Sequence, residues 1–100
     1  MRTINIFLTD PVAGDFPDFD NGDLRYAFAR LFPDGPRRLV EGPVCAFVDW
    51  VMDDLSGLEM CRRLRSDPRM EDAHITIVLE EDDAEDKRRA LRAGADDYLV

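Results

Sequence analysis

The stretch "FVDWVMDDLSGLE", residues 47–59, decides the fold of this chain. An apolar run ends in Asp49, so residues 44–49 predict a buried strand that brings a carboxylate to its end. Two more acids follow at Asp53 and Asp54. Ser56 is then a candidate N-cap, and Glu59 at the third position after it completes a capping box. The sequence therefore predicts a helix over residues 56–65, directly behind the strand.

Strand and helix patterns alternate through the rest of the second half. Residues 74–79 are a short apolar run that predicts a strand, and a further strand is expected to begin within residues 95–100. Residues 83–93 predict a helix, because acids in its first turn and arginines near its end match the helix macrodipole. Gly94 is a typical stop for that helix. This alternation predicts an α/β fold with a doubly wound parallel sheet.

The first half is less regular. Residues 3–8 predict a strand that ends at Thr9-Asp10-Pro11. Residues 11–23 predict an acidic loop, and the spacing of its acids excludes a calcium-binding EF-hand. Residues 23–32 predict a helix, since Leu24, Phe28 and Leu31 recur at i, i+4 and i+7. A very short strand is expected within residues 37–43.

The composition limits the function. One hundred residues that are 45% hydrophobic suffice for a single domain with a core. The net charge of −9 argues against direct binding of nucleic acid; it suits a divalent cation or a basic partner, or is simply an acidic surface. No stretch is long enough to span a membrane. Cys45 and Cys61 are isolated in apolar patterns and predict reduced core thiols, hence a cytoplasmic location.

Asp10 and Asp49 are the candidate site residues. In doubly wound folds, ligands bind outside the carboxyl ends of the strands, where both acids are expected. Two converging carboxylates would suit a magnesium-like ion and could position a phosphoryl donor, with one carboxylate as the nucleophile. The alternative is that both are ordinary acids that meet solvent where a strand ends.

The segments "FVDWVMDDLSGLEMCRRLR", "HITIVL" and "ALRAGADDYLV" together resemble the second half of a bacterial response-regulator receiver domain, the CheY-like fold of two-component signalling. The resemblance covers residues 44–100 without gaps. It implies that Asp49 is the phospho-acceptor and that Gly57 is the glycine that opens the following helix. It also implies a magnesium site formed by Asp10, Asp49 and the backbone carbonyl of Val51. Tyr98 corresponds to the aromatic residue that changes rotamer on activation.

The same resemblance implies partners. A histidine kinase or phosphotransfer protein would donate the phosphoryl group. An output domain or protein partner would respond through the surface of the fourth and fifth repeats.

Two departures from the family weaken this switch. The adjacent pair of acids expected after the first strand is Thr9-Asp10, so one metal carboxylate is lost. Asp53, Asp54 or an acid of residues 15–23 could substitute for it. The Ser or Thr expected after the third strand is replaced by Leu79 or, with a shift of one residue, by Glu80. The family lysine would fall one residue past Val100. Magnesium binding is therefore expected to be weakened.

The fold is expected to be abbreviated. The segment between Asp10 and Asp49 is several residues shorter than in the family, so either one helix alone or one helix together with the edge strand is expected to be missing or replaced by the 11–23 loop. The closing helix is absent, which would leave one face of the sheet exposed. Residues 1–100 are interpreted as a single receiver-like domain, the N-terminal portion of a longer protein. Alternatively, a partner or a homodimer covers that face.

Two functions remain in competition. The first is a phosphorylatable receiver with Asp49 as acceptor; the second is a phosphorylation-independent pseudo-receiver for protein interaction or dimerisation. An enzyme is not expected, because the chain has neither a glycine-rich phosphate loop nor a Ser-His or Cys-His arrangement. The basic residues of the two helices, Arg62, Arg63, Arg65 and Lys87-Arg88-Arg89, are interpreted mainly as solvated faces.

Overall fold

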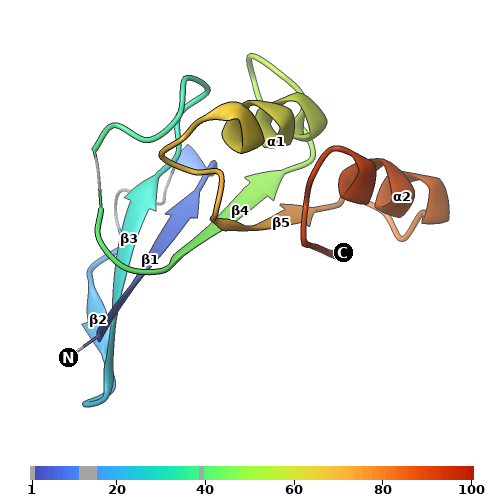
Figure 1. The fold of residues 1–100 in the computed structure, drawn as a ribbon. Helices are drawn as coiled ribbons and strands as arrows, with labels where there is room; N and C mark the ends of the chain where they lie inside the picture. Colours follow the sequence, from blue (N-terminus) through green and yellow to red (C-terminus); the bar gives the residue numbers. More distant parts are fainter. Residues whose placement is uncertain (1, 12–15, 39) are drawn as a thin grey trace.

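A six-stranded sheet forms the centre of the molecule, for which the computed structural model describes residues 2–11, 16–38 and 40–100 (Figure 1). Its strand order is β2-β3-β1-β4-β5-β6, and only β2 pairs antiparallel to its neighbour. The elements are β1 (Arg2–Leu8), β2 (Phe19–Asp20), β3 (Leu24–Arg30), β4 (Val44–Asp49), α1 (Gly57–Ser66), β5 (His74–Val78), α2 (Ala84–Arg92) and β6 (Asp97–Leu99). The predicted α/β class with a parallel sheet is confirmed.

The core lies between one face of the sheet and both helices. Successive side chains of a strand point to opposite faces, and on the helix-covered face the strands contribute fully buried residues. Burying one Phe, Val or Ile side chain in this way stabilises the fold by roughly 1.5–3 kcal/mol. These strand residues are Phe7, Ala46, Val48, Ile75 and Ile77, and the helices add Met60, Cys61, Leu64 and Ala90. None of the helices in the described residues is long and apolar enough to cross a membrane.

The helix starts follow the sequence signals. The Ser56 hydroxyl accepts a hydrogen bond from the Glu59 backbone N–H at 3.2 Å, which is the predicted N-cap of α1. Asp83 caps α2 by accepting from the N–H groups of Glu85 and Asp86. Cys61 is buried in the core without a disulfide, and burial raises the pKa of its thiol.

The helix predicted over residues 23–32 is wrong, because this segment is strand β3. Leu24, Tyr26 and Phe28 alternate along the chain, and all seven residues of β3 pair in parallel with β1. Aromatic side chains favour strands. The rings of Phe28 and Phe16 meet edge to face, with 5.8 Å between their centroids. The rings of Tyr26 and Phe19 are stacked, also with 5.8 Å between their centroids. Sheet pairing and aromatic packing therefore override the helical spacing.

The first half holds no α-helix among its described residues. β1 leads to β3 through the short strand β2, and β3 leads to β4 through residues 31–43, where the described residues form no strand either. β3 lies beside β1, with the short strand β2 outside it at the edge, and no α-helix connects β1 to β3 or β3 to β4 within the described residues. The very short strand expected within residues 37–43 is therefore wrong for its described residues, and Leu39 lies outside them.

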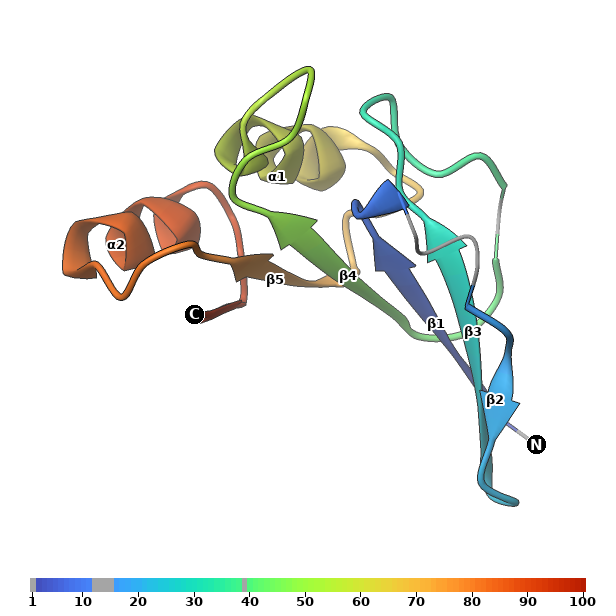
Figure 2. The same cartoon turned by 180° about the vertical axis from the view of Figure 1, so that it is seen from behind.

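The opposite face of the sheet carries no helix in the described part of the chain (Figure 2). Ile4, Ile6 and Phe47, whose side chains alternate with the buried ones, are only half-buried there. At the end of the chain, Leu99 is 49% exposed and Val100 is 66% exposed. This agrees with the expectation of one exposed sheet face.

Arg65 is a bridge between elements rather than part of a solvated face. Its guanidinium donates to the carbonyl of Gly94 at 2.7 Å, to that of Ala73 at 2.7 Å and to the Asp96 carboxylate at 2.5 Å. The same carboxylate accepts from the Ile75 N–H at 2.9 Å. Gly94 has a φ of +108°, and a Cβ there would lie 2.8 Å from Arg65 Cγ. Both the backbone conformation and the close contact therefore favour glycine at this position. One side chain thus ties α1 to β5 and to the turn after α2.

We predict that Asp96→Asn lowers the free energy of unfolding at pH 7 by roughly 1 kcal/mol, because it weakens charge-assisted hydrogen bonds on a partly exposed group. Burial would raise the pKa of Asp96, but the Ile75 N–H and Arg65 outweigh it, so the pKa lies below its ordinary value. A depressed folded-state pKa means that the stabilisation is complete above the unfolded pKa, about 3.9, and is lost at lower pH. Urea unfolding should therefore show the difference from wild type shrinking on acidification below about pH 4.

Asp72→Asn, on an exposed loop residue, is the control and should leave stability nearly unchanged at pH 7. An Asp96→Asn variant as stable as wild type at pH 7 would contradict the prediction.

Candidate functional site

A cavity of about 150 Å³ lies at the carboxyl edge of the sheet. Three of its walls come from the ends of neighbouring parallel strands: Thr9 follows β1, Arg30 ends β3 and Asp49 ends β4. The remaining lining comes from the loops after these strands: Pro11, Leu31, Pro33, Val51, Met52, Asp53 and Asp54. The parallel strand order therefore places a cavity that contains Asp49 at the carboxyl edge of the sheet.

Thr9 and Asp49 are joined by two hydrogen bonds at the base of this cavity. The Thr9 hydroxyl donates to Asp49 Oδ2 at 2.9 Å and accepts from the Asp49 backbone N–H, also at 2.9 Å. Thr9 is only 6% exposed, so water competes little for either bond. Asp49 Oδ1 receives no hydrogen bond from any described residue. The residue that replaces an expected acid thus fixes one oxygen of the candidate acceptor, and the other has no partner within the described part of the chain.

The backbone around Asp49 is packed tightly against the start of α1. The Trp50 N–H donates to the Val78 carbonyl at 3.0 Å, and the Gly57 N–H donates to the Trp50 carbonyl at 2.9 Å. A Cβ on Gly57 would lie 2.3 Å from the carbonyl oxygen of Asp49, a distance that no side chain can adopt. The Ser56-Gly57 pair therefore has two separate tasks: Ser56 caps the helix, and Gly57 lets it approach the strand.

The oxygen ligands suggested for magnesium are only partly gathered. Val51, Asp53 and Asp54 line the cavity together with Asp49. Asp10 follows Thr9 as an exposed residue and is not part of the cavity lining. Among the described residues, no three His, Cys, Asp or Glu side chains are grouped so as to hold a metal ion. The donor chemistry suits magnesium, but the carboxylates converge too little for a strong site, and the role of Asp10 stays a prediction.

The candidate switch residues lie away from this cavity. Leu79 is buried and donates its N–H to the Leu99 carbonyl at 2.7 Å, while Glu80 is exposed. Tyr98 is half-buried in β6, and the Lys87 ammonium lies 5.4 Å from its ring centroid. Neither Leu79 nor Glu80 can supply a side-chain hydroxyl. Within the described residues, the hydroxyl that contacts Asp49 is that of Thr9.

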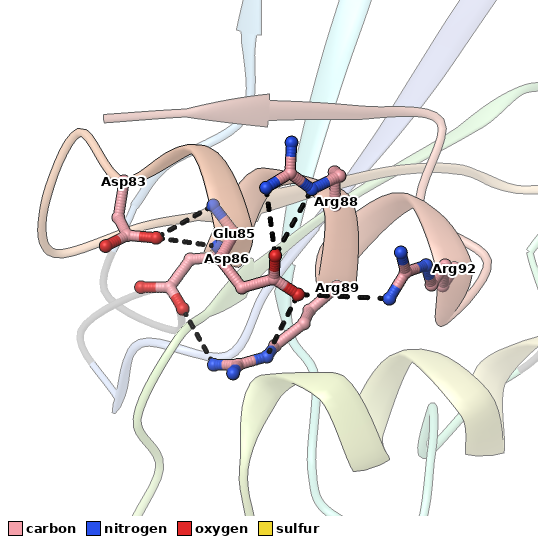
Figure 3. Close-up of polar contacts among 6 residues, drawn as sticks. All are labelled: Asp83, Glu85, Asp86, Arg88, Arg89 and Arg92. Atoms are coloured by element: carbon pink, nitrogen blue, oxygen red, sulfur yellow. Dashed lines mark hydrogen bonds and ion pairs between the residues drawn. The ribbon is translucent and has the colours of Figure 1, made fainter.

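The basic residues of α2 are paired with acids of their own helix (Figure 3). Arg88 donates to Glu85 at 2.9 Å and Arg89 to Asp86 at 3.2 Å, while Arg92 lies 3.9 Å from Glu85. The hydrogen bond from Arg88 lowers the pKa of the Glu85 carboxyl. Lys87 pairs with Asp82 in the preceding loop. The surface of α2 is thus a mixed-charge face, as expected for a solvated helix.

Two cavity residues were missed as contributors by the sequence analysis. The sequence indicates only that Thr9 stands where the family has an acid, although a hydroxyl in that position can still form hydrogen bonds with Asp49. Arg30 was assigned to a helix, so nothing placed it at the carboxyl edge. The alternation of Leu24, Tyr26 and Phe28 is a strand signal, but the helical spacing of Leu24, Phe28 and Leu31 competes with it.

Fold and site together define an α/β protein with a mostly parallel sheet, which presents a carboxylate in a cavity at the carboxyl edge of that sheet. Residues 39–100 match the family model of the response regulator receiver domain. The chain therefore belongs to the response regulator receiver family, whose members are signalling modules of two-component systems.

Known proteins support this assignment. The phosphate regulon transcriptional regulatory protein PhoB of Rhizobium meliloti is 38% identical over 58 residues, which cover 58% of this chain and 26% of the relative. The chain thus spans about a quarter of that protein's length. The phosphorylated cyanobacterial phytochrome response regulator RcpA aligns with a TM-score of 0.65 at 11% identity, over 99% of this chain and 79% of that one.

A response regulator protein of Burkholderia pseudomallei, solved with a phosphorylated aspartic acid, a calcium ion and citrate, has a TM-score of 0.57 at 17% identity. The alignment covers 99% of this chain and 59% of that one. At such identities the solved structures establish the fold alone.

We predict that Thr9→Val lowers the free energy of unfolding by roughly 1–3 kcal/mol, because the Asp49 N–H loses its acceptor in a buried setting. Urea unfolding followed by circular dichroism measures the change. Thr9→Ser keeps the hydroxyl and is the matched control, with a loss well below that of Thr9→Val. Equal stability of Thr9→Val and wild type would show that the two hydrogen bonds contribute nothing.

Proposed function

We propose that this chain is a receiver domain in which Asp49 accepts a phosphoryl group from a histidine kinase or phosphotransfer protein. The observation that carries the proposal is the position of Asp49 in the cavity at the end of β4, with Oδ2 held by Thr9. Family membership supplies the reaction class, and the geometry supplies an oriented carboxylate with one available oxygen.

The transfer follows from this arrangement. Asp49 Oδ1 attacks the phosphorus of the donor phosphohistidine and forms an O–P bond. The P–N bond breaks, and its electron pair returns to the donor's imidazole, which takes up a proton from solvent water and leaves as neutral histidine. Thr9 holds the carboxylate in one orientation throughout, which reduces the entropy lost on reaching the reactive geometry. A bound magnesium ion would neutralise charge on the phosphoryl oxygens, with Asp10, Asp49 and the Val51 carbonyl as its proposed ligands.

The response belongs to the same proposal. The new phosphoryl charge lies beside Asp53 and Asp54 in the cavity lining, so like charges repel and the loop after β4 is biased toward another arrangement. The shift would reach an output region through α2, β6 and Tyr98. The chain would act in the cytoplasm as the N-terminal receiver portion of a longer protein, either alone or as a homodimer.

A pseudo-receiver is the second candidate, and specific observations favour it. Thr9 replaces a metal acid, neither Leu79 nor Glu80 offers a hydroxyl, and the described residues gather no three-ligand metal group. The half-buried sheet face without a helix would then serve a protein partner. In this reading the fold is kept for interaction and Asp49 stays as part of the scaffold.

We predict that acetyl phosphate with magnesium adds one phosphoryl group to the wild-type chain and none to Asp49→Asn. Intact-mass spectrometry measures the product. Asp72→Asn, at the amino-terminal end of β5, is the matched control and should be modified like wild type. If wild type gains no mass with acetyl phosphate, phosphoramidate or a phosphotransfer protein, the pseudo-receiver becomes the better description.

A further inference from the structure

Arg30 differs from every other residue that lines the cavity. It is the single basic residue among the ten described lining residues, which include the three acids Asp49, Asp53 and Asp54. It ends β3, beside Leu8 of β1, so the sheet itself fixes the position of its backbone. A cation in this position faces the part of the molecule where negative charge is concentrated.

The side chain of Arg30 is held with an unused donor. Its Nε is buried and is the single buried side-chain nitrogen or oxygen, within the described residues, that has no hydrogen-bond partner. The guanidinium carbon lies 4.7 Å from the ring centroid of Phe32, a cation–π contact that restrains the group without using its N–H donors. A buried unpaired donor costs free energy, so an acceptor that completes it gains that amount on binding.

We propose that Arg30 is a phosphoryl-anchoring residue, whose guanidinium donates a hydrogen bond to an oxygen of a phosphoryl group bound in this cavity next to Asp49. The cavity holds about 150 Å³, whereas one water needs only about 10–15 Å³, so a tetrahedral anion has room. The planar guanidinium matches the oxygens of such a group. Arg30 also offsets the repulsion that Asp53 and Asp54 exert on an incoming anion.

This inference rests on the proposed function for the covalent step, but binding of the anion can be measured separately. Asp49→Asn removes the acceptor, so an acyl phosphate binds there without reacting. Acetyl phosphate with magnesium is titrated into this variant, and the Arg30 Nε–Hε resonance is followed by NMR. We expect a saturable shift of that resonance.

A variant series on the Asp49→Asn background tests the residue. Arg30→Ala should weaken acetyl phosphate binding by about tenfold or more, the typical effect of losing a charged hydrogen bond. Arg30→Lys should recover part of the affinity, since it restores charge without the planar fork. Arg37→Ala is the matched control, because Arg37 also stacks on Phe32, at 4.0 Å, but does not line the cavity. It should bind like its parent.

The outcomes separate the two proposals. Equal binding by the Arg30→Ala and Arg37→Ala variants, each shown by circular dichroism to be folded, overturns the role of Arg30, as does a titration without saturation. Arg30-dependent binding in a chain whose wild type gains no phosphate mass supports the anion site and overturns only the phospho-acceptor. Phosphorylation of wild type at the same rate with and without Arg30 leaves Asp49 as acceptor and removes Arg30 from the site.

Discussion

The parallel pairing of β1 with both β3 and β4 is the constraint on which the site depends. Leu8 pairs with Arg30 on one side and with Phe47 on the other, so the three strands end at the same edge. The residues at and just after these strand ends, such as Thr9 and Asp49, can then line one cavity. Because side chains alternate between faces, a slip of one residue would turn the buried set of β1 toward the other face and carry Thr9 away from Asp49. The hydrophobic core therefore fixes the register that the site requires.

Two glycines allow the helices and their turns to pack closely against the rest of the fold. Gly57 allows α1 to contact the backbone of Asp49, and Gly94 allows the turn after α2 to contact Arg65. The Arg65 and Asp96 side chains then join α1, β5 and the turn before β6. The position of the candidate acceptor is consequently supported from behind by close packing, whereas the other sheet face contributes little to it.

The second half of the fold could be predicted from the sequence because its signals are local. Ser56 and Asp83 cap the helices that they were expected to start, and the apolar run to Asp49 is a strand. The first half of the fold could not be predicted, because residues 24–31 carry two competing patterns. Leu24, Phe28 and Leu31 fit a helical face, while Leu24, Tyr26 and Phe28 fit a strand face equally well. Only pairing with β1, a contact distant in sequence, decides between them. The roles of Asp10, Val51 and Tyr98 stay predictions, since their positions alone do not test them.

The replacement of an acid by Thr9 changes the electrostatics of the site as well as its ligand count. A carboxylate within hydrogen-bonding distance of Asp49 would repel it, and such a pair needs a cation or a proton to be stable. A hydroxyl instead donates to Asp49, so the acceptor is stable without an ion between two acids. If Asp49 accepts a phosphoryl group as proposed, Arg30 is the basic residue of the described cavity lining that can add positive charge beside a bound ion.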